Sequence, residues 1–549
     1  MPLDDLVLAL QRFVDRLVRR ARRGRAPTPG RRRLLVVQID GLSRGVLEQA
    51  LAEGRMPFLR RVIERAGWRV HPMFVGLPSS TPSFQLAAMY GVRPDIPGFH
   101  YHDKRQREDV YFPRAGDAAR VERAQASGRR GIVEGGACYG CVFTGGALQN
   151  LFTFAIMKRP SGSGLLATLS AVIVLLWVTL KSTVITVIEL ARAVLRLLAD
   201  PVGEWARGWK WLAIKLGLSV WVRELFTLAV ARDVYAGVPS IYVNYLDYDV
   251  VSHAYGPRHP RALRSLRRID DAIKQIWRVC RRVPEHAYDL YILSDHGQAL
   301  TKPFGQLSGG RRFERVIFED FFTPAGARPV SPERPAGRHR LASGIKALRM
   351  GRAPGYFQRF FNYIEDGFPW ILGEVKEAHE RDNVRVIAAG PNAFIYFVDH
   401  AEALSIERIE ERWPGLAEDL SRHPGVGYVL TRGADGPVCF WRGKRYRLSL
   451  AEPGPFAARP DAPLVVSAVA DLMAMPSAGD LVVYGIDASS GHVSYIAEAG
   501  AHAGPSPEEL HTFVVAPPGV RLPEPLNHPI QLYPHFVRYV EDVEREPAA

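Results

Sequence analysis

Three short apolar segments of this 549-residue chain are each followed directly by acidic residues. They are Leu34 to Ile39 before Asp40, Ser240 to Leu246 before Asp247 and Asp249, and Tyr288 to Ser294 before Asp295. Segments of this length that are mostly apolar are typical of strands buried on both faces of a parallel sheet. Open α/β sheets bind their ligands beyond the carboxyl ends of such strands. The pattern therefore predicts an α/β fold with polar side chains gathered at one edge of the sheet.

Helical stretches separate these segments, and Leu481 to Gly485 and Thr512 to Ala516 have the character of further strands. Strands that alternate with helices predict a doubly wound, mostly parallel sheet. We expect an apolar helical hairpin and a small accessory α/β subdomain to interrupt this core. The expected ranges are 1-30 for a basic amphipathic helix and linker, 31-157, 236-305 and 461-549 for the core, 158-235 for the hairpin, and 306-460 for an inserted lobe with the accessory subdomain.

The formal net charge of +14 favours an anionic partner: nucleic acid, an acidic lipid surface or a phosphorylated substrate. Ten of the arginines lie between positions 12 and 33, close to apolar sequence. This arrangement favours a membrane surface over a DNA groove, and the chain contains no short nucleic-acid-binding signature.

Two regions have the composition of membrane-associated segments. Residues 1–25 repeat apolar positions at helical spacing with arginines on the other face, which fits an interfacial helix or a helix packed on the protein's own core. Residues 161–180 carry no charge, and tryptophans follow up to position 221. We expect a hairpin over residues 161–230 that spans or dips into a bilayer, with a buried helix as the alternative. The N-terminus does not resemble a cleavable signal peptide, so the cytoplasmic face is favoured. The oligomeric state is left open.

Aspartates and histidines suited to binding metal lie at or near the expected strand ends. Asp249 and His253 are four residues apart, Asp295 and His296 are adjacent, and His502 lies in a Gly-Ala-His-Ala-Gly segment. Paired metal ions that hydrolyse phosphoesters need carboxylate and imidazole ligands, together with a nucleophile. Each fragment alone is a weak signal, but their joint occurrence in one order is specific.

The order of these motifs resembles the alkaline phosphatase superfamily, and most closely its type I phosphodiesterase/nucleotide pyrophosphatase branch. The resemblance covers Leu34 to Lys104, Ser240 to Leu300 and Asp480 to Pro517. That branch has a nucleophilic threonine three residues after a proline and ten before a glycine. Pro78, Thr81 and Gly91 match this spacing. Alignment on the proline at position 82 instead nominates Ser80 as the runner-up nucleophile.

The resemblance also implies a role for each remaining residue. Asp40, Thr81, Asp295 and His296 would hold one divalent metal ion, and Asp249, His253 and His502 would hold a second. Asp249 is preferred to Asp247 because only Asp249 has the family's spacing to His253. The family's oxyanion-stabilising asparagine aligns with His102, which departs from the pattern.

Together these features predict a metal-dependent phosphoester hydrolase of the phosphodiesterase or nucleotide pyrophosphatase type, acting through a phospho-threonine intermediate at a two-metal site. Three aspartates and three histidines form a mixed ligand set that favours zinc, and manganese also fits. A phosphomonoesterase or a lipid head-group phosphohydrolase of the same superfamily is the nearest alternative. An inactive membrane-associated scaffold is the alternative of another class.

Overall fold

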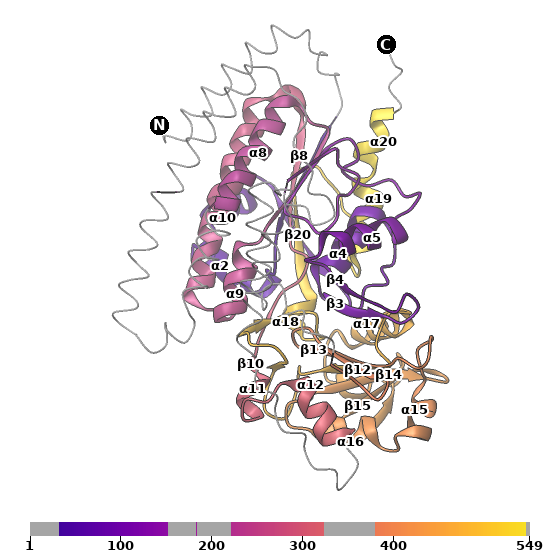
Figure 1. Ribbon diagram of the computed structural model, residues 1–549. Coiled ribbons are helices and arrows are strands. Elements are labelled where there is room, and N and C mark those ends of the chain that lie inside the picture. Colours follow the sequence, from indigo (N-terminus) through magenta and orange to yellow (C-terminus); the bar gives the residue numbers. More distant parts are fainter. Residues whose placement is uncertain (1–31, 152–182, 184–220, 323–378, 545–549) are drawn as a thin grey trace.

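The computed structural model describes residues 32–151, 183, 221–322 and 379–544 (Figure 1). Its larger sheet is mostly parallel, as predicted, and only the β20 strand runs against the others. Across the sheet the order is β2 (Arg69–Phe74), β20 (His511–Ala516), β8 (Tyr288–Leu293), β1 (Arg33–Ile39), β7 (Ser240–Tyr245), β5 (Ala137–Tyr139) and β6 (Gln149–Leu151). The three strands that the sequence pattern singled out, β8, β1 and β7, are thus adjacent at the centre.

Helices cover both faces of this sheet (Figure 1). The side chains of β1 show why, since Leu35, Val37 and Ile39 enter one apolar core while Leu34 and Val36 enter another. The first core contains α2 (Arg44–Ala52), α3 (Pro57–Arg65), α8 (Arg223–Ala236), α9 (Asp247–Tyr255) and α10 (Pro260–Arg282). The opposite face carries α4 (Thr81–Tyr90), α5 (Ala115–Gln125), α19 (Tyr533–Phe536) and α20 (Arg538–Glu544). A central strand that buries both faces has no polar alternation, which explains its continuous apolar sequence.

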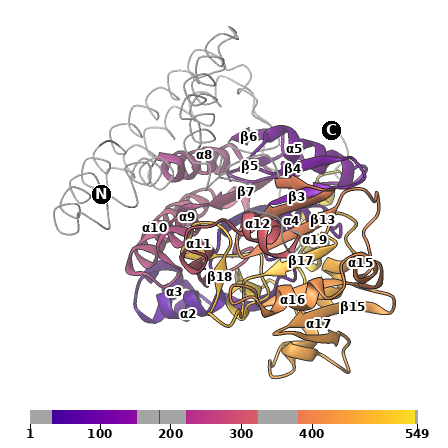
Figure 2. The same cartoon turned by 60° about the horizontal axis from the view of Figure 1, so that its bottom comes forward.

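A second, antiparallel sheet lies beside the first (Figure 2). Its order is β11 (His379–Arg381), β12 (Val384–Ala388), β13 (Asn392–Phe397), β17 (Leu481–Tyr484), β14 (Tyr428–Gly433), β15 (Gly436–Trp441) and β16 (Lys444–Arg447). One face packs on α15 (Ile406–Arg412), α16 (Leu416–Arg422) and α12 (Phe313–Val316), and the other on α17 (Ala462–Ala474).

The expectation that Leu481 to Gly485 belongs to the catalytic sheet is wrong. This strand, β17, lies at the centre of the second sheet between β13 and β14. A short apolar strand is equally suited to the centre of either kind of sheet, because both bury its two faces. After β17 the chain returns to the first sheet through β18 (Val493–Ser494), β19 (Gly500–Ala501) and α18 (Pro507–Leu510).

Among the described residues no helix has the length and apolar character needed to cross a bilayer. Of the ranges expected to contact lipid, residues 1–25 and almost all of 161–220 lie outside the described residues. The described end of the second range packs inside the protein, since Phe226 and Val230 of α8 are buried in the core beneath α10. The range expected to contact lipid therefore does not extend to residue 230, because these residues are in the protein's own core.

Candidate metal centre

The carboxyl ends of three adjacent strands bring the aspartates together. Asp40 follows β1, Asp295 follows β8 after one residue, and Asp249 lies in the first turn of α9 just beyond β7. Gly41 makes this approach possible, because it has a φ of +73° and a Cβ there would lie 2.5 Å from Asp249 Oδ1. A side chain at this position would therefore be strained and would displace Asp249.

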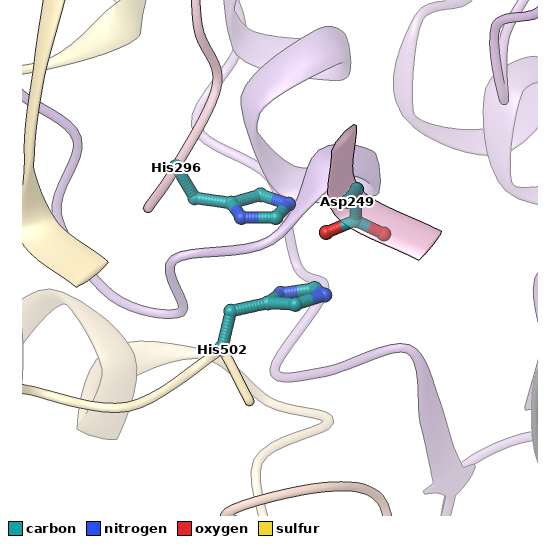
Figure 3. Close-up of side chains that lie close together, drawn as sticks. All are labelled: Asp249, His296 and His502. Atoms are coloured by element: carbon teal, nitrogen blue, oxygen red, sulfur yellow. The ribbon is translucent and has the colours of Figure 1, made fainter. Parts of the chain in front are cut away.

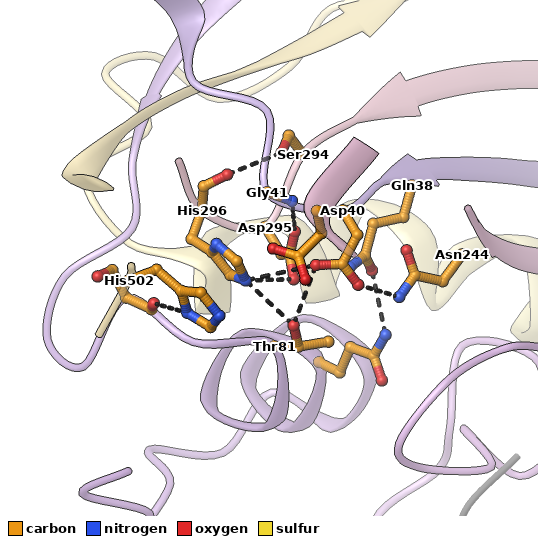
Figure 4. A network of polar contacts seen from close by, with 12 residues as sticks. Gln38, Asp40, Gly41, Thr81, Asn244, Ser294, Asp295, His296 and His502 are labelled. Atoms are coloured by element: carbon orange, nitrogen blue, oxygen red, sulfur yellow. Dashed lines mark hydrogen bonds and ion pairs between the residues drawn. The ribbon is translucent and has the colours of Figure 1, made fainter. Parts of the chain in front are cut away.

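A first cluster surrounds the ring nitrogen Nε2 of His296 (Figure 4). Oδ1 of Asp40 and Oδ2 of Asp295 each lie 3.4 Å from this nitrogen, and Oγ1 of Thr81 lies 3.2 Å from it. The Thr81 hydroxyl is also 3.4 Å from Asp40 Oδ1. Asp40, Asp295 and His296 are buried and offer ligand atoms within 4.8 Å of one another.

A second cluster joins Asp249, His296 and His502, whose ligand atoms also lie within 4.8 Å of one another (Figure 3). The rings of His296 and His502 are stacked with centroids 3.8 Å apart. His253 adjoins this cluster, with Nε2 3.3 Å from Asp249 Oδ2 and its ring centroid 5.1 Å from that of His502. All six predicted metal ligands and Thr81 therefore converge on one place, with His296 between the two clusters.

Each of the three histidines has its Nδ1 atom engaged away from the cluster. Nδ1 of His502 lies 3.1 Å from the carbonyl oxygen of Ser79, and that of His296 lies 3.1 Å from the carbonyl oxygen of Gly297. Nδ1 of His253 lies 2.7 Å from Glu498 Oε2. Because these partners accept hydrogen bonds, Nδ1 can donate to them, which leaves Nε2 of each ring as the nitrogen that would bind a metal ion.

The charges of the buried acids point to a cation. Burial and the neighbouring aspartates raise the pKa of Asp40 well above its usual value, and burial raises the pKa of Asp295. Burial also acts to raise the pKa of Asp249, but the charge and hydrogen bond of His253 outweigh it and lower that pKa. Oδ2 of Asp295 accepts no hydrogen bond although it is buried. Unpaired buried carboxylates are unfavourable, so this donor set fits divalent cations.

The two hydroxyls proposed as nucleophile differ in their surroundings. Thr81 is the first residue of α4 and its hydroxyl touches the first cluster, whereas the buried hydroxyl of Ser80 makes no hydrogen bond. The Ser79 hydroxyl accepts from the amide of Ala503 at 3.1 Å, which ties this turn to the His502 segment. The geometry thus favours Thr81, and the N-terminus of α4 places a positive dipole end beside it.

Two other predicted positions have partners of their own. His102 lies in β3 (His100–Asp103), paired with β4 (Glu108–Tyr111), and its Nδ1 is 2.8 Å from both Asp109 Oδ1 and Arg385 Nη1. Among the described contacts of its ring, none reaches Thr81. Asp247 pairs with the buried Arg223 and not with the cluster. The preference for Asp249 over Asp247 agrees with this arrangement.

Three residues that orient the ligands escaped the sequence analysis. Asn244 of β7 donates to Asp40 Oδ2 at 2.6 Å, Gln298 donates to Asp249, and Glu498 accepts from His253. Asn244 is paired with Gln38 in the register of β7 with β1, so it lies near the end of its strand and close to Asp40. Alignment of the two strand sequences by their ends can reveal this position. Glu498 carries no such signal, because it lies in a loop far along the chain.

We expect Asn244→Ala to weaken metal binding and activity by about 10- to 100-fold, since outer-shell partners orient their ligands. The substitution removes the only hydrogen bond described for the buried Asp40 Oδ2. Calorimetric zinc titration and the rate of bis-p-nitrophenyl phosphate hydrolysis measure the two effects. Asn150→Ala, at a half-buried amide in β6, is the matched control. Wild-type zinc affinity in the Asn244 variant would contradict the assignment.

Comparison with known protein families shows to which family the chain belongs. The family model for type I phosphodiesterase / nucleotide pyrophosphatase matches residues 34–314, more than half of the chain. The chain belongs to this family. This phosphodiesterase-family protein is a metal-dependent phosphoester hydrolase, as the resemblance to the alkaline phosphatase superfamily predicted.

This phosphodiesterase-family protein also has similarity to solved structures. It is similar to phosphonoacetate hydrolase from Sinorhizobium meliloti 1021, solved in complex with phosphonoformate and with phosphonoacetate. In both cases the identity is 14%, the TM-score is 0.47, and 94% of this chain and 97% of the other are covered. No curated protein sequence matches the chain.

Proposed function

We propose that this protein is a two-metal phosphodiesterase that acts through a phospho-threonine intermediate on Thr81. The observation that carries the proposal is the position of the Thr81 hydroxyl, 3.2 Å from His296 Nε2 and 3.4 Å from Asp40 Oδ1, at the N-terminus of α4. A buried hydroxyl held against carboxylate and imidazole ligands is the arrangement that an activated nucleophile needs. Asp40, Asp295 and His296 would hold one cation, and Asp249, His253 and His502 the other.

The reaction would proceed in two displacements. Bound cations supply positive charge that lowers the pKa of the hydroxyl and offsets charge on the phosphoryl oxygens. Thr81 Oγ1, oriented by Asp40 Oδ1, would release its proton to solvent and form a bond to phosphorus. The bond to the leaving group would break at the same time, and the alcohol would take a proton from solvent. The backbone N–H of Thr81, at the start of α4, would stabilise the charged phosphoryl oxygens. Water then attacks phosphorus, which releases phosphate monoester and restores the threonine.

Zinc is the proposed metal, because the ligand set has equal numbers of imidazoles and carboxylates and contains no amide or carbonyl ligand. Manganese accepts the same ligands. The oxyanion role of His102 is also part of the proposal. The support for this role is the resemblance alone, since the described contacts of the His102 ring are with Asp109, Arg385 and Tyr396.

Membrane association stays a prediction that rests on residues 1–25 and 161–220, outside the described residues. If these segments bind lipid, a phospholipid head group or another lipid-linked phosphate ester becomes a candidate substrate, because it would lie close to the site. Flotation of the full-length protein with vesicles of phosphatidylserine and phosphatidylcholine tests this. Protein that remains at the bottom of the gradient at low salt would remove the cytoplasmic-membrane location from the proposal.

A substrate comparison tests the proposed activity. Metal-stripped protein is supplied with zinc or manganese and assayed with bis-p-nitrophenyl phosphate and with p-nitrophenyl phosphate. We expect metal-restored hydrolysis with the diester preferred. Preference for the monoester would support a phosphomonoesterase. No hydrolysis of either ester together with no bound metal would support the inactive scaffold.

A further inference from the structure

The loop between the two sheets carries a buried acid that the proposed mechanism does not use. Glu498 lies between β18 and β19, and its side chain is only 5% exposed. Its Oε2 atom is 2.7 Å from Nδ1 of His253, and its Oε1 atom accepts from the hydroxyl of Ser494 at 2.7 Å. Both carboxylate oxygens are therefore hydrogen-bonded, which fixes the orientation of the carboxylate.

Glu498 contacts the side of the His253 ring that faces away from Asp249. Nε2 of His253 lies 3.3 Å from Asp249 Oδ2, while Glu498 approaches Nδ1. The two nitrogens of an imidazole point in different directions, so Glu498 is placed behind the ring and does not share the ion that His253 would bind. A carboxylate in this position holds the ring orientation, keeps the proton on Nδ1 and makes Nε2 more basic.

Backbone hydrogen bonds attach the Glu498 loop to α9 and to the turn between β12 and β13. The amide of Ala499 donates to the carbonyl of His253 at 2.7 Å, and the amide of Tyr495 donates to the carbonyl of Gly390 at 2.7 Å. Glu498 is thus held by the segment leaving the second sheet and acts on a helix of the first.

We propose that Glu498 is a positioning residue that selectively strengthens binding of the cation held by Asp249, His253 and His502. This rests on the proposed two-metal function. The carbonyl oxygen of Gly500, 2.8 Å from the same Nδ1, offers a neutral partner that could orient the ring alone. The proposal states that the charged partner Glu498, and not Gly500, sets the affinity.

The test is titration of the metal-free full-length protein with zinc alone, followed by calorimetry and by metal content after dialysis. Two ions are expected to bind to the wild type. Glu498→Gln keeps the shape of the side chain but removes its charge, so the affinity of one ion is expected to fall by about 10- to 100-fold while the other is unchanged. Glu122→Gln is the matched control, because Glu122 is a buried acid bonded to Thr144 and Tyr90, away from the cluster.

The outcomes separate this proposal from the proposed function. Two ions bound at wild-type affinity by the Glu498 variant would overturn the role of Glu498 and leave the two-metal site intact. An equal loss for both ions would overturn the selectivity. A wild type that binds fewer than two ions would overturn the two-metal function itself. If Glu498→Gln does not fold, Ser494→Ala frees the other carboxylate oxygen, and weakening of one ion is again the expected result.

Discussion

Thr81→Ala is expected to lower kcat for bis-p-nitrophenyl phosphate by roughly 10⁴-fold or more, because loss of a nucleophile removes the covalent pathway. The hydroxyl is the atom that contacts Asp40 and His296. Thr81 is almost fully buried at the start of α4, and alanine favours helices, so folding should be retained. Steady-state kinetics on zinc-loaded protein measures the effect, and circular dichroism checks the fold.

Two variants at the same turn serve as controls for this experiment. Ser80→Ala removes a hydroxyl that has no hydrogen-bond partner, so activity should stay within about threefold of the wild type. Thr81→Ser retains the hydroxyl and should keep most of the activity lost in Thr81→Ala. If Ser80→Ala were as inactive as Thr81→Ala, the runner-up nucleophile would have to replace the proposed one. Trapping of phosphate on the protein at low pH would identify the modified residue.

Removal of the metals is expected to abolish hydrolysis and to lower the melting temperature by several degrees. At a thousandfold excess of zinc over its dissociation constant, each ion contributes about 4 kcal/mol to the free energy of unfolding. Without cations, the carboxylates of the buried Asp40 and Asp295 and of the half-buried Asp249 remain close together. Chelation followed by differential scanning fluorimetry measures the change, and readdition of zinc should reverse it. Unchanged melting after complete metal removal would contradict a structural contribution from the cations.

The stabilisation by zinc should increase with pH. The raised pKa values of Asp40 and Asp295 mean that their contribution to metal-free stability is complete below about pH 4 and is lost as the pH rises through the raised values. The opposite holds for Asp249, whose lowered pKa contributes stability that is lost as the pH falls below about 4. Asp249 and Glu498 raise the pKa of His253 although burial opposes this, so zinc must also displace a proton there. A zinc-induced melting shift larger at about pH 7.5 than at about pH 5.5 is the expected result.

The sequence was informative where a local pattern has one structural solution. An apolar strand that ends in an acid is such a case, and Asp40, Asp249 and Asp295 lie together at the carboxyl edge of the sheet because β1, β7 and β8 are neighbours. The spacing of Asp249 to His253 places both side chains on one face of α9, one helical turn apart. The family resemblance supplied what periodicity does not, namely which threonine and which distant histidine join them.

Other features depended on pairings that no local pattern encodes. β17 is apolar and short, so its sequence does not distinguish the second sheet from the first. Glu498 reads as an ordinary loop acid until the fold brings it behind His253. His102 was chosen by alignment, and its pairing with Arg385 of β12 depends on contact between the β3–β4 hairpin and the second sheet. Each of these features is set by tertiary contacts between residues that lie far apart in the sequence.

The position of His502 after the second sheet has a consequence for biosynthesis. Five of the six aspartate and histidine ligands have been synthesised once His296 is made, but the last follows about two hundred residues later. Because β17 must pair with β13 and β14 before the chain returns through β18 and β19, capture of the second ion requires both sheets to be assembled. Hydrolytic competence would therefore arise only after His502 has emerged, so a nascent chain that ends before this residue would not act on phosphoesters.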